Sequence, residues 1–547
     1  MAKALKIRDI TLRDGQQSLF SARLPQETVE GILPLYREAG FHIVELWGGK
    51  LLDASMRHLG ESPWERLRRC SEILDGTTLV GAVSRGRNLF GYSPYPNYVL
   101  ESFYKEAVKN GLNVMRLFDA LNDIGNLKDS VVMLNEYGAT PDVALCYTID
   151  PPEERLPEPK KKNFFSRLFG NTFLGNIFGN SEEIEPHERV FTDEYYVNKA
   201  KEIEASGAGI FTLKDMAGLI TPSRLYTLMP KLKHAIKIPV DFHTHCNAGY
   251  GLASALTAIL KGVDIVDTAI WWFAGGTSAP AIELIWIFCK KLDIDSAVNM
   301  EAVSKIRGKL KEARKSLSDF DRNRDHLPHD FEEYYSNMPA EIDSEFDRAI
   351  QAASDNNEKE LLDACRKIES YFGFPEPDRK IQNPDMPYGM YLDITEDLWR
   401  LNVEDMLEET MALIPKVRRD AGFVPLVAPA SRIIGKQAVA LALDRRNGEA
   451  DYTRLDNRFV ALIKGEYGHT PKEIDPFFRE EITGSQEEEP YDISTFSEPA
   501  NPELPEFGGM KLAQNDEEYL LLELMPELAE TYLKKRREKD FKDKTRE

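Results

Sequence analysis

Two neighbouring apolar runs of this chain end in residues that could hold a metal ion. Lys214 closes one run, and His243 and His245 close the next. On a β-strand, residues two apart point to the same side, about 6–7 Å apart at Cα, which suits two imidazole ligands of one metal. An ammonium group cannot bind a cation, so Lys214 becomes a ligand only if CO2 converts it to a carbamate, an anionic group with two oxygens. That chemistry indicates a protein that handles carboxyl groups.

Short β-branched runs alternate with segments of helical period over the first half of the chain. The runs lie at residues 5–11, 42–47, 78–84, 114–119, 143–148, 210–215, 239–245 and 265–270. Eight strands alternating with helices predict an α/β fold, a (β/α)8 TIM barrel followed by a mainly helical C-terminal domain. In such barrels the carboxyl ends of the strands carry the chemistry, and the polar residues of this chain gather there.

Composition divides the chain into four segments. We expect a TIM-barrel domain at 1–300 with an insertion at about 151–190, a helical domain at 301–480, a flexible acidic linker at 481–515, and an amphipathic helix with a charged tail at 516–547. The insertion follows the fifth strand on the catalytic face, so we expect it to govern access or docking rather than chemistry. Its basic and aromatic stretch at 160–180 suits contact with a membrane subunit, or a lid packed on the barrel.

Net charge, the length of the apolar runs and the cysteine content exclude several classes of protein. A net charge of -22 argues against nucleic acid as a partner, because a phosphate backbone would be repelled. No apolar run approaches the roughly 20 residues that span a bilayer, and the first residues predict no signal peptide. Five scattered cysteines without a C-x-x-C spacing are typical of reduced thiols. We therefore expect a cytoplasmic protein.

The chain also carries a series of motifs in a fixed order. They are Thr11-Leu12-Arg13-Asp14 with Gln17-Ser18, Glu45-Leu46-Trp47-Gly48-Gly49, Asp53-Ala54-Ser55-Met56-Arg57, Phe118-Asp119-Ala120-Leu121-Asn122-Asp123, Lys214-Asp215-Met216-Ala217-Gly218-Leu219, His243-x-His245, Pro425-Leu426-Val427-x-Pro429 and Lys464-Gly465-Glu466-Tyr467-Gly468. Together they resemble the carboxyltransferase domain of biotin-dependent carboxylases, the family of pyruvate carboxylase, oxaloacetate decarboxylase and the pyruvate-side subunit of transcarboxylase. The resemblance covers most of residues 5–280 and 385–475. It implies an enzyme that moves a carboxyl group between carboxybiotin and a 2-oxo acid, with pyruvate and oxaloacetate as the first candidates.

The resemblance assigns a metal centre to the strand ends. It implies a divalent metal, Zn, Mn or Co, bound by Asp14, His243, His245 and carbamylated Lys214. Two imidazoles and two anionic oxygen donors suit these metals and leave coordination positions open for substrate or water.

The resemblance also assigns substrate-binding residues. Arg85 and Arg13 would clamp the 2-oxo acid, because a planar guanidinium suits a carboxylate. Gln17 would hold the other end of the substrate or the biotin carbonyl. Asp53 and Tyr92 would brace Arg13 and its neighbours.

A threonine in the loop after the eighth strand completes the implied site. Thr277 matches the family residue that carries a proton between the substrate methyl group and the biotin ring nitrogen. Three positions depart from the family pattern: Gln16 replaces a histidine, Cys246 follows the second metal-ligand histidine, and Ala279 replaces a glutamine in the loop of Thr277. These departures bear on the identity of the substrate more than on the type of reaction.

The partners follow from what the sequence does not present. We recognise no ATP-grasp domain, and Gly509-Met510-Lys511-Leu512, which is similar to the A-M-K-M of biotin carriers, lies in the acidic linker without a hairpin pattern. We therefore expect biotin to be supplied in trans by a biotin carboxyl carrier protein, with a biotin carboxylase subunit as a second partner. We also expect a homodimer or larger oligomer.

Two alternatives remain open from the sequence. One is a metal-dependent Claisen-type acyl transferase of the same barrel superfamily, although that group lacks Lys214-Asp215-Met216-Ala217 and the 425–439 motif. The other is a non-catalytic assembly subunit that keeps the barrel to dock carrier proteins. The sequence leaves open the direction of flux and the identity of the metal.

Overall fold

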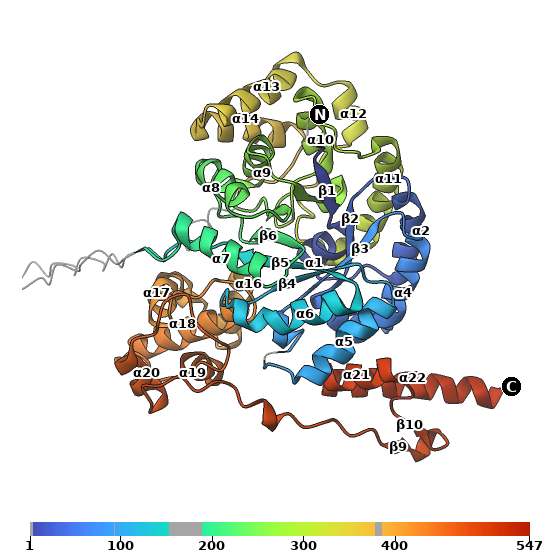
Figure 1. The fold of residues 1–547 in the computed structure, drawn as a ribbon, viewed down its shortest axis with the longest axis vertical. Helices are drawn as coiled ribbons and strands as arrows, with labels where there is room; N and C mark the ends of the chain where they lie inside the picture. Colours follow the sequence, from blue (N-terminus) through green and yellow to red (C-terminus); the bar gives the residue numbers. More distant parts are fainter. Residues whose placement is uncertain (1–3, 92, 153–188, 378–385, 547) are drawn as a thin grey trace, which may run out of the picture.

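The protein is built around a closed parallel barrel of eight strands (Figure 1). The computed structural model describes residues 4–91, 93–152, 189–377 and 386–546. The strands are β1 (Lys6–Asp9), β2 (Ile43–Gly48), β3 (Leu79–Ser84), β4 (Val114–Phe118), β5 (Thr140–Cys146), β6 (Ile210–Asp215), β7 (Val240–Thr244) and β8 (Ile265–Thr268). Each strand pairs with the next, and β8 closes onto β1. The predicted (β/α)8 barrel is confirmed.

Helices cover the outside of the barrel and connect consecutive strands. They are α1 (Gln16–Phe20), α2 (Gln26–Tyr36), α3 (Lys50–Ala54), α4 (Pro63–Leu74), α5 (Asn97–Lys109), α6 (Lys128–Tyr137), α7 (Asp193–Ala205), α8 (Pro222–Ala235), α9 (Gly251–Leu260) and α10 (Ile282–Lys291). Several begin at side chains that accept a backbone N–H, as Ser62 does for α4 and Thr221 for α8, each followed by a proline in the first turn. These local signals fix where the chain leaves each strand for the next helix.

The barrel core continues past the eighth strand. Helices α11 (Met300–Ser316), α12 (Phe331–Ser336), α13 (Ala340–Ser354) and α14 (Glu358–Tyr371) follow it. Their buried side chains, such as Ile306, Phe346 and Ile368, belong to the same apolar cluster as the strands. The sequence predicts a domain boundary at 300, whereas the shared core extends to Phe374 because these helices pack on the barrel rather than on the segment that follows.

A second core forms from five later helices. These are α16 (Tyr388–Arg400), α17 (Leu407–Asp420), α18 (Ala430–Asn447), α19 (Asn457–Lys464) and α20 (Pro476–Thr483). Their cluster includes Ala120, Leu121 and Cys146 from the ends of the barrel strands β4 and β5. The helical domain is therefore packed on the barrel through apolar side chains.

The C-terminal segment returns to the barrel. The predicted acidic linker contains a short antiparallel hairpin, β9 (Glu503–Leu504) with β10 (Met510–Lys511), at the place where the sequence indicated no hairpin. The single predicted helix is divided into α21 (Asp516–Leu524) and α22 (Pro526–Arg546), because Pro526 cannot continue the backbone hydrogen bonding of α21. Figure 1 shows α21 beside α5. Trp64 Nε1 of α4 also donates to the Glu517 carbonyl of α21 at 3.0 Å.

Two predictions lie outside the described residues. They are the role of Tyr92 and the behaviour of the insertion, of which 153–188 is not described, including the stretch 160–180. Within the described ranges, the helices are all too short or too polar to cross a membrane.

Candidate active site at the barrel mouth

Three potential metal ligands converge at the carboxyl ends of β1 and β7. Asp14 lies on the π-helical turn η1 (Thr11–Gly15) that follows β1, His243 lies on β7, and His245 follows it directly. One ligand atom from each lies within 4.8 Å of the others, and His245 Nε2 is 3.1 Å from Asp14 Oδ1. All three side chains are buried. The H-x-H spacing therefore places both rings on one side of the strand, as the sequence predicts.

The donor atoms of this group are in the state that binds a cation. The buried His243 Nε2 has no hydrogen-bond partner among the described residues, and His245 Nε2 lies 3.1 Å from Asp14 Oδ1. Burial, with the nearby Lys214 charge, lowers the pKa of His243 to about 3, so its imidazole is neutral at pH 7. Burial alone would raise the pKa of Asp14, but Arg13 and the two histidines hold that pKa well below its usual range. Two imidazoles beside a carboxylate with a lowered pKa fit a divalent metal.

Lys214 is the cross-strand neighbour of His243 in the pairing of β6 with β7. Its side chain is 5% exposed, and within the described residues its ammonium group has no hydrogen bond or ion pair that would hold its charge. Burial and then the positive charge of Arg116 lower the pKa of Lys214. The neutral amine is the form that reacts with CO2, so the surroundings of Lys214 favour carbamate formation.

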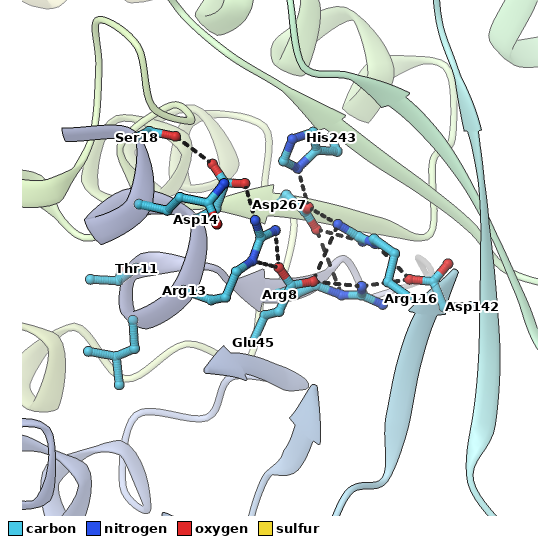
Figure 2. A network of polar contacts seen from close by, with 12 residues as sticks. Arg8, Thr11, Arg13, Asp14, Ser18, Glu45, Arg116, Asp142, His243 and Asp267 are labelled. Carbon is cyan, nitrogen blue, oxygen red and sulfur yellow. Dashed lines mark hydrogen bonds and ion pairs between the residues drawn. The ribbon is translucent and has the colours of Figure 1, made fainter. Parts of the chain in front are cut away.

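A layer of charged side chains fills the barrel beneath the candidate metal site, where apolar residues are the usual filling. Figure 2 shows Arg8 and Arg116 among the carboxylates. Arg116 donates to Asp142 at 2.8 Å, to Asp241 at 2.8 Å and to Asp267 at 2.5 Å. The two arginines and the three aspartates are at most 1% exposed. Removing one charge from such a buried network would leave its partners uncompensated, so each of these side chains depends on the others.

This charged layer reaches the metal ligands through Asp267. Its Oδ2 lies 2.6 Å from His243 Nδ1, which assigns the ring proton to Nδ1 and leaves Nε2 facing the site (Figure 2). The predictions from sequence did not include Arg8, Arg116, Asp142, Asp241 or Asp267. The sequence feature that could have indicated these residues is a charged side chain within each of several otherwise apolar strands.

Arg13, which the sequence predicts to clamp the substrate, lies between two carboxylates at the cavity. Its Nε donates to Glu45 Oε1 at 2.6 Å, and its Nη1 lies 2.6 Å from Asp14 Oδ2. Both contacts are buried, so the guanidinium orients Asp14 from the side of the barrel wall. Asp53, expected to brace Arg13, instead pairs with Arg57 four residues later, at 3.0 and 2.7 Å. Glu45 supplies the brace, because it points inward from β2 while Asp53 lies on the helical turn beyond it.

A large cavity opens above these residues. Its volume is about 2290 Å³. The candidate residues that line it are Arg13, Asp14, Gln17, Asp53, Arg85, Lys214, His245 and Thr277. Thr277 Oγ1 donates to the Ser18 carbonyl at 3.2 Å, and Ser18 Oγ donates to Asp14 Oδ1 at 3.1 Å, so one residue connects the threonine to the metal-ligand group. The structure thus brings the candidate residues that it describes to one chamber.

Family models match both parts of this chamber. A model described as a conserved carboxylase domain matches residues 381–546, and one described as HMGL-like matches residues 185–309. The first covers the helical domain and C-terminal segment, and the second covers the strands that carry Lys214 and the histidines.

Known relatives match along most of this chain. A pyruvate carboxylase subunit of Methanocaldococcus jannaschii is 30% identical over 97% of this chain and 78% of that protein. The methylmalonyl-CoA carboxyltransferase 5S subunit of Propionibacterium freudenreichii subsp. shermanii is 28% identical over 86% of this chain and 75% of that protein. The 2-oxoglutarate carboxylase large subunit of Hydrogenobacter thermophilus is 28% identical over 90% of this chain and 61% of that protein.

Solved structures share the fold. The carboxyl transferase domain of Rhizobium etli pyruvate carboxylase superposes with a TM-score of 0.73 at 22% identity, over 97% of this chain and 76% of that one. The fold of the barrel and the helical domain is therefore shared. With its similarity to the M. jannaschii protein along nearly its whole length, the chain belongs to the family of biotin-dependent carboxyltransferases that includes that pyruvate carboxylase subunit, and it is an enzyme.

Proposed function

We propose that this enzyme moves a carboxyl group between carboxybiotin on a separate carrier protein and a 2-oxo acid, with pyruvate and oxaloacetate as the acceptor and product. The observation that carries the proposal is the convergence of Asp14, His243 and His245, whose ligand atoms lie within 4.8 Å of one another, beside the large cavity that Asp14 and His245 line. The direction of transfer in the cell depends on the supply of the two acids, because the same groups serve both directions.

A divalent metal, Zn, Mn or Co, would be held by Asp14, His243, His245 and a carbamate on Lys214. The donor set fits, because two imidazoles and two anionic oxygen groups match the ligands that these ions prefer. Such an ion acts as a Lewis acid that polarises a carbonyl oxygen and stabilises the negative charge of an enolate. In the carbamate, the Lys214 nitrogen bonds to the carbon of CO2 and gives up one proton to solvent.

The remaining residues would position the reactants. Arg85 lies at the cavity wall, where its guanidinium would bind the carboxylate of the 2-oxo acid. Gln17 accepts a hydrogen bond from the Lys50 backbone N–H at 3.2 Å through Oε1, which fixes its amide at the same wall. Thr277 would accept the methyl proton of the acid on its hydroxyl while donating its own proton to the biotin ring nitrogen. Arg13 would hold Asp14 in place.

The partners are part of the proposal. We propose a biotin carboxyl carrier protein and a biotin carboxylase subunit as partners, a homodimer or larger oligomer, and a cytoplasmic location. In support, the chain matches only 34% of the length of the pyruvate carboxylase of Staphylococcus aureus. The remaining length of that protein lies outside the part that resembles this chain. The buried, unbridged cysteines are consistent with a reducing compartment.

Substitution of Lys214 tests the metal centre. Lys214→Ala should lose most of its bound metal, because the other three ligands lack the second anionic donor. Lys231→Ala is a matched control, since Lys231 is an exposed residue of α8 paired with Asp193. Elemental analysis gives the metal content, a 13C signal after incubation with labelled bicarbonate reports the carbamate, and oxaloacetate decarboxylation with free biotin gives the activity.

Two results would count against the proposal. A Lys214→Ala protein with full metal and full activity would show that Lys214 is not a ligand. Wild-type protein that condenses an acyl-CoA with a 2-oxo acid, and does not decarboxylate oxaloacetate, would instead favour the Claisen-type alternative.

A further inference from the structure

Two cations at the cavity wall have no role in the proposed function. Lys50 opens α3 after β2, and Arg322 lies in the loop after α11. Both side chains line the cavity that holds the candidate catalytic residues. Within the described residues, neither forms an ion pair within 4 Å of a carboxylate. The carboxylate nearest to Lys50 in sequence, Asp53, is already bound to Arg57 at two points.

Arg322 is fixed beside the proton-carrying threonine. Its Nη1 donates to the Ser18 carbonyl at 3.1 Å, the same oxygen that accepts from Thr277 Oγ1 at 3.2 Å. Its Nη2 donates to Ser21 Oγ at 3.3 Å, and its backbone N–H donates to the Leu19 carbonyl. A guanidinium has five N–H donors, so the group keeps donors for a ligand after these contacts.

Lys50 is attached to the same part of the site. Its backbone N–H is bonded to Gln17 Oε1, which places α3 against the turn that carries Ser18. Burial, followed by repulsion from Arg322, lowers the pKa of Lys50. Burial also lowers the pKa of Arg322.

The charges that face this pair leave it cationic. Asp393 of α16 is the carboxylate felt by both cations, and Tyr388 of α16 faces Arg322. Asp393 also faces Arg432 of α18, and burial raises its pKa, while Asp53, which faces Lys50 as well, is held by Arg57. A chain with a net charge of -22 thus presents a positive spot inside its reaction chamber. An anionic ligand bound there would relieve the repulsion.

We infer that Lys50 and Arg322 form a second carboxylate subsite, which binds the carboxyl group that is being transferred. The inference rests on the proposed function. Because Arg322 and Thr277 share one acceptor oxygen, an anion held by Arg322 lies beside the hydroxyl that handles the methyl proton. The carbon that loses this proton is the carbon that gains the carboxyl group. The two cations only bind, and no bond to them is formed or broken.

Binding measurements distinguish an acid with one carboxylate, such as pyruvate, from acids with two, such as oxaloacetate and 2-oxoglutarate. The full-length, metal-loaded protein is titrated by calorimetry, without biotin, with pyruvate, oxaloacetate and 2-oxoglutarate. Arg322→Met and Lys50→Met should each weaken oxaloacetate binding about 10-fold or more, the usual effect of losing one charge-assisted hydrogen bond, and pyruvate binding less than about 2-fold. Arg322→Lys should recover part of the loss. Both side chains are exposed to the cavity, so folding and metal content should stay unchanged.

A matched control tests for a general effect of charge. Lys535 on α22 lines the same cavity from another element, and Lys535→Met removes the same charge. It should leave all three affinities unchanged. An equal loss of oxaloacetate binding in this control would overturn the subsite, because it would reflect the overall field rather than a specific contact.

The remaining outcomes distinguish the subsite from the proposed function. Equal weakening of pyruvate and oxaloacetate, or no weakening, would overturn the subsite. Selective loss of 2-oxoglutarate binding would overturn the assignment to the transferred carboxyl group and show that the cations bind the distal carboxylate of a longer acid. If the wild-type protein binds none of the three acids, the proposed function fails before the subsite is tested.

Discussion

The ring of His243, a candidate metal ligand, is held in one orientation and one tautomer by its buried neighbours. Asp267 accepts a hydrogen bond from His243 Nδ1–H at 2.6 Å, and Asp267 is itself held by Arg116 at 2.5 Å. The ring can therefore neither rotate nor change tautomer without breaking a buried contact. Because the fold already orients the His243 ring, a bound metal would not have to order it, and the affinity for the metal would be higher.

Asp267→Asn tests this arrangement. The amide keeps the shape but loses the charge that fixes the His243 proton and neutralises Arg116, so metal affinity should fall about 10- to 100-fold. Chelator competition measures the affinity, and circular dichroism checks the fold. Asp295→Asn, an exposed aspartate after α10, is the control. Unchanged affinity in a folded Asp267→Asn protein would show that Asp267 serves the barrel core alone.

Thr277 is expected to act on the proton rather than on binding. Thr277→Ala should fold and bind metal and pyruvate normally, because its hydroxyl bonds only a backbone carbonyl of the described chain. Carboxyl transfer should drop by roughly 10²–10⁴-fold, the usual effect of a lost proton relay, and Thr277→Ser should recover part of it. Initial rates of oxaloacetate formation with carboxylated carrier measure this, and comparable rates for wild type and Thr277→Ala would contradict the role.

At the scale of elements, short turns after the strands aim the functional side chains. The turn η1 puts Arg13 and Asp14 side by side, both buried, between β1 and α1. Its start is fixed by Asp9, the last residue of β1, which accepts from Thr11 Oγ1 at 2.6 Å and from Tyr36 Oη at 3.0 Å. One carboxyl group therefore joins β1, η1 and α2.

The stability contributed by Asp9 should depend on pH. Burial raises the pKa of Asp9 to about 7, whereas a free aspartate in the unfolded chain has a pKa near about 3.9. The folded state binds the proton more tightly, so the contribution is complete below the unfolded pKa and is lost as the pH rises through about 7.

Asp9→Asn, which cannot ionise, removes this dependence. Relative to wild type, its free energy of unfolding should rise by about 2–3 kcal/mol between about pH 5 and pH 8. Urea unfolding at the two pH values measures the change, with the exposed Asp319→Asn as control. Parallel pH profiles for wild type and Asp9→Asn would contradict a raised pKa.

At the scale of the whole molecule, three parts enclose the reaction chamber. The barrel mouth forms the floor, Tyr388 and Arg432 of the helical domain form one wall, and Tyr532 of α22 forms another. The helix α22 is held by Arg537, which makes a two-point contact with Glu518 of α21 at 2.8 and 3.2 Å. The C-terminal segment is thus part of the enzyme site rather than an appendage.

Removing Arg537 should loosen this wall. Arg537→Ala leaves Glu518 buried without its main cation and should destabilise the docked helices by about 3–5 kcal/mol, while the exposed Lys534–Glu530 pair on the same helix is worth less than about 1 kcal/mol. Limited proteolysis should cut the C-terminal segment of Arg537→Ala and spare Lys534→Ala. Equal protection in both variants would show that α22 is held by its apolar contacts alone.

The sequence by itself determined the elements and the candidate metal ligands. Eight apolar runs specified the strands, because a buried parallel strand needs a continuous apolar stretch, and the spacing of His243 and His245 placed both rings on one face. Family motifs directed attention to Asp14 and Thr277, which the structure brings to one cavity. These inferences depend on local order along the chain, which the sequence contains directly.

Tertiary structure decided which charges meet. Arg116 on β4 and Asp267 on β8 become neighbours only when the barrel closes, so no spacing along the chain could pair them. Asp53 shows the opposite case. Its carboxylate forms an ion pair with Arg57, four residues later on the same helical segment, and not with Arg13. Lys50 and Arg322 meet at one cavity wall only because the loop after α11 folds back onto α1. Contacts between segments that are distant in sequence depend on how the helices and strands pack, and this packing exists only in the folded protein.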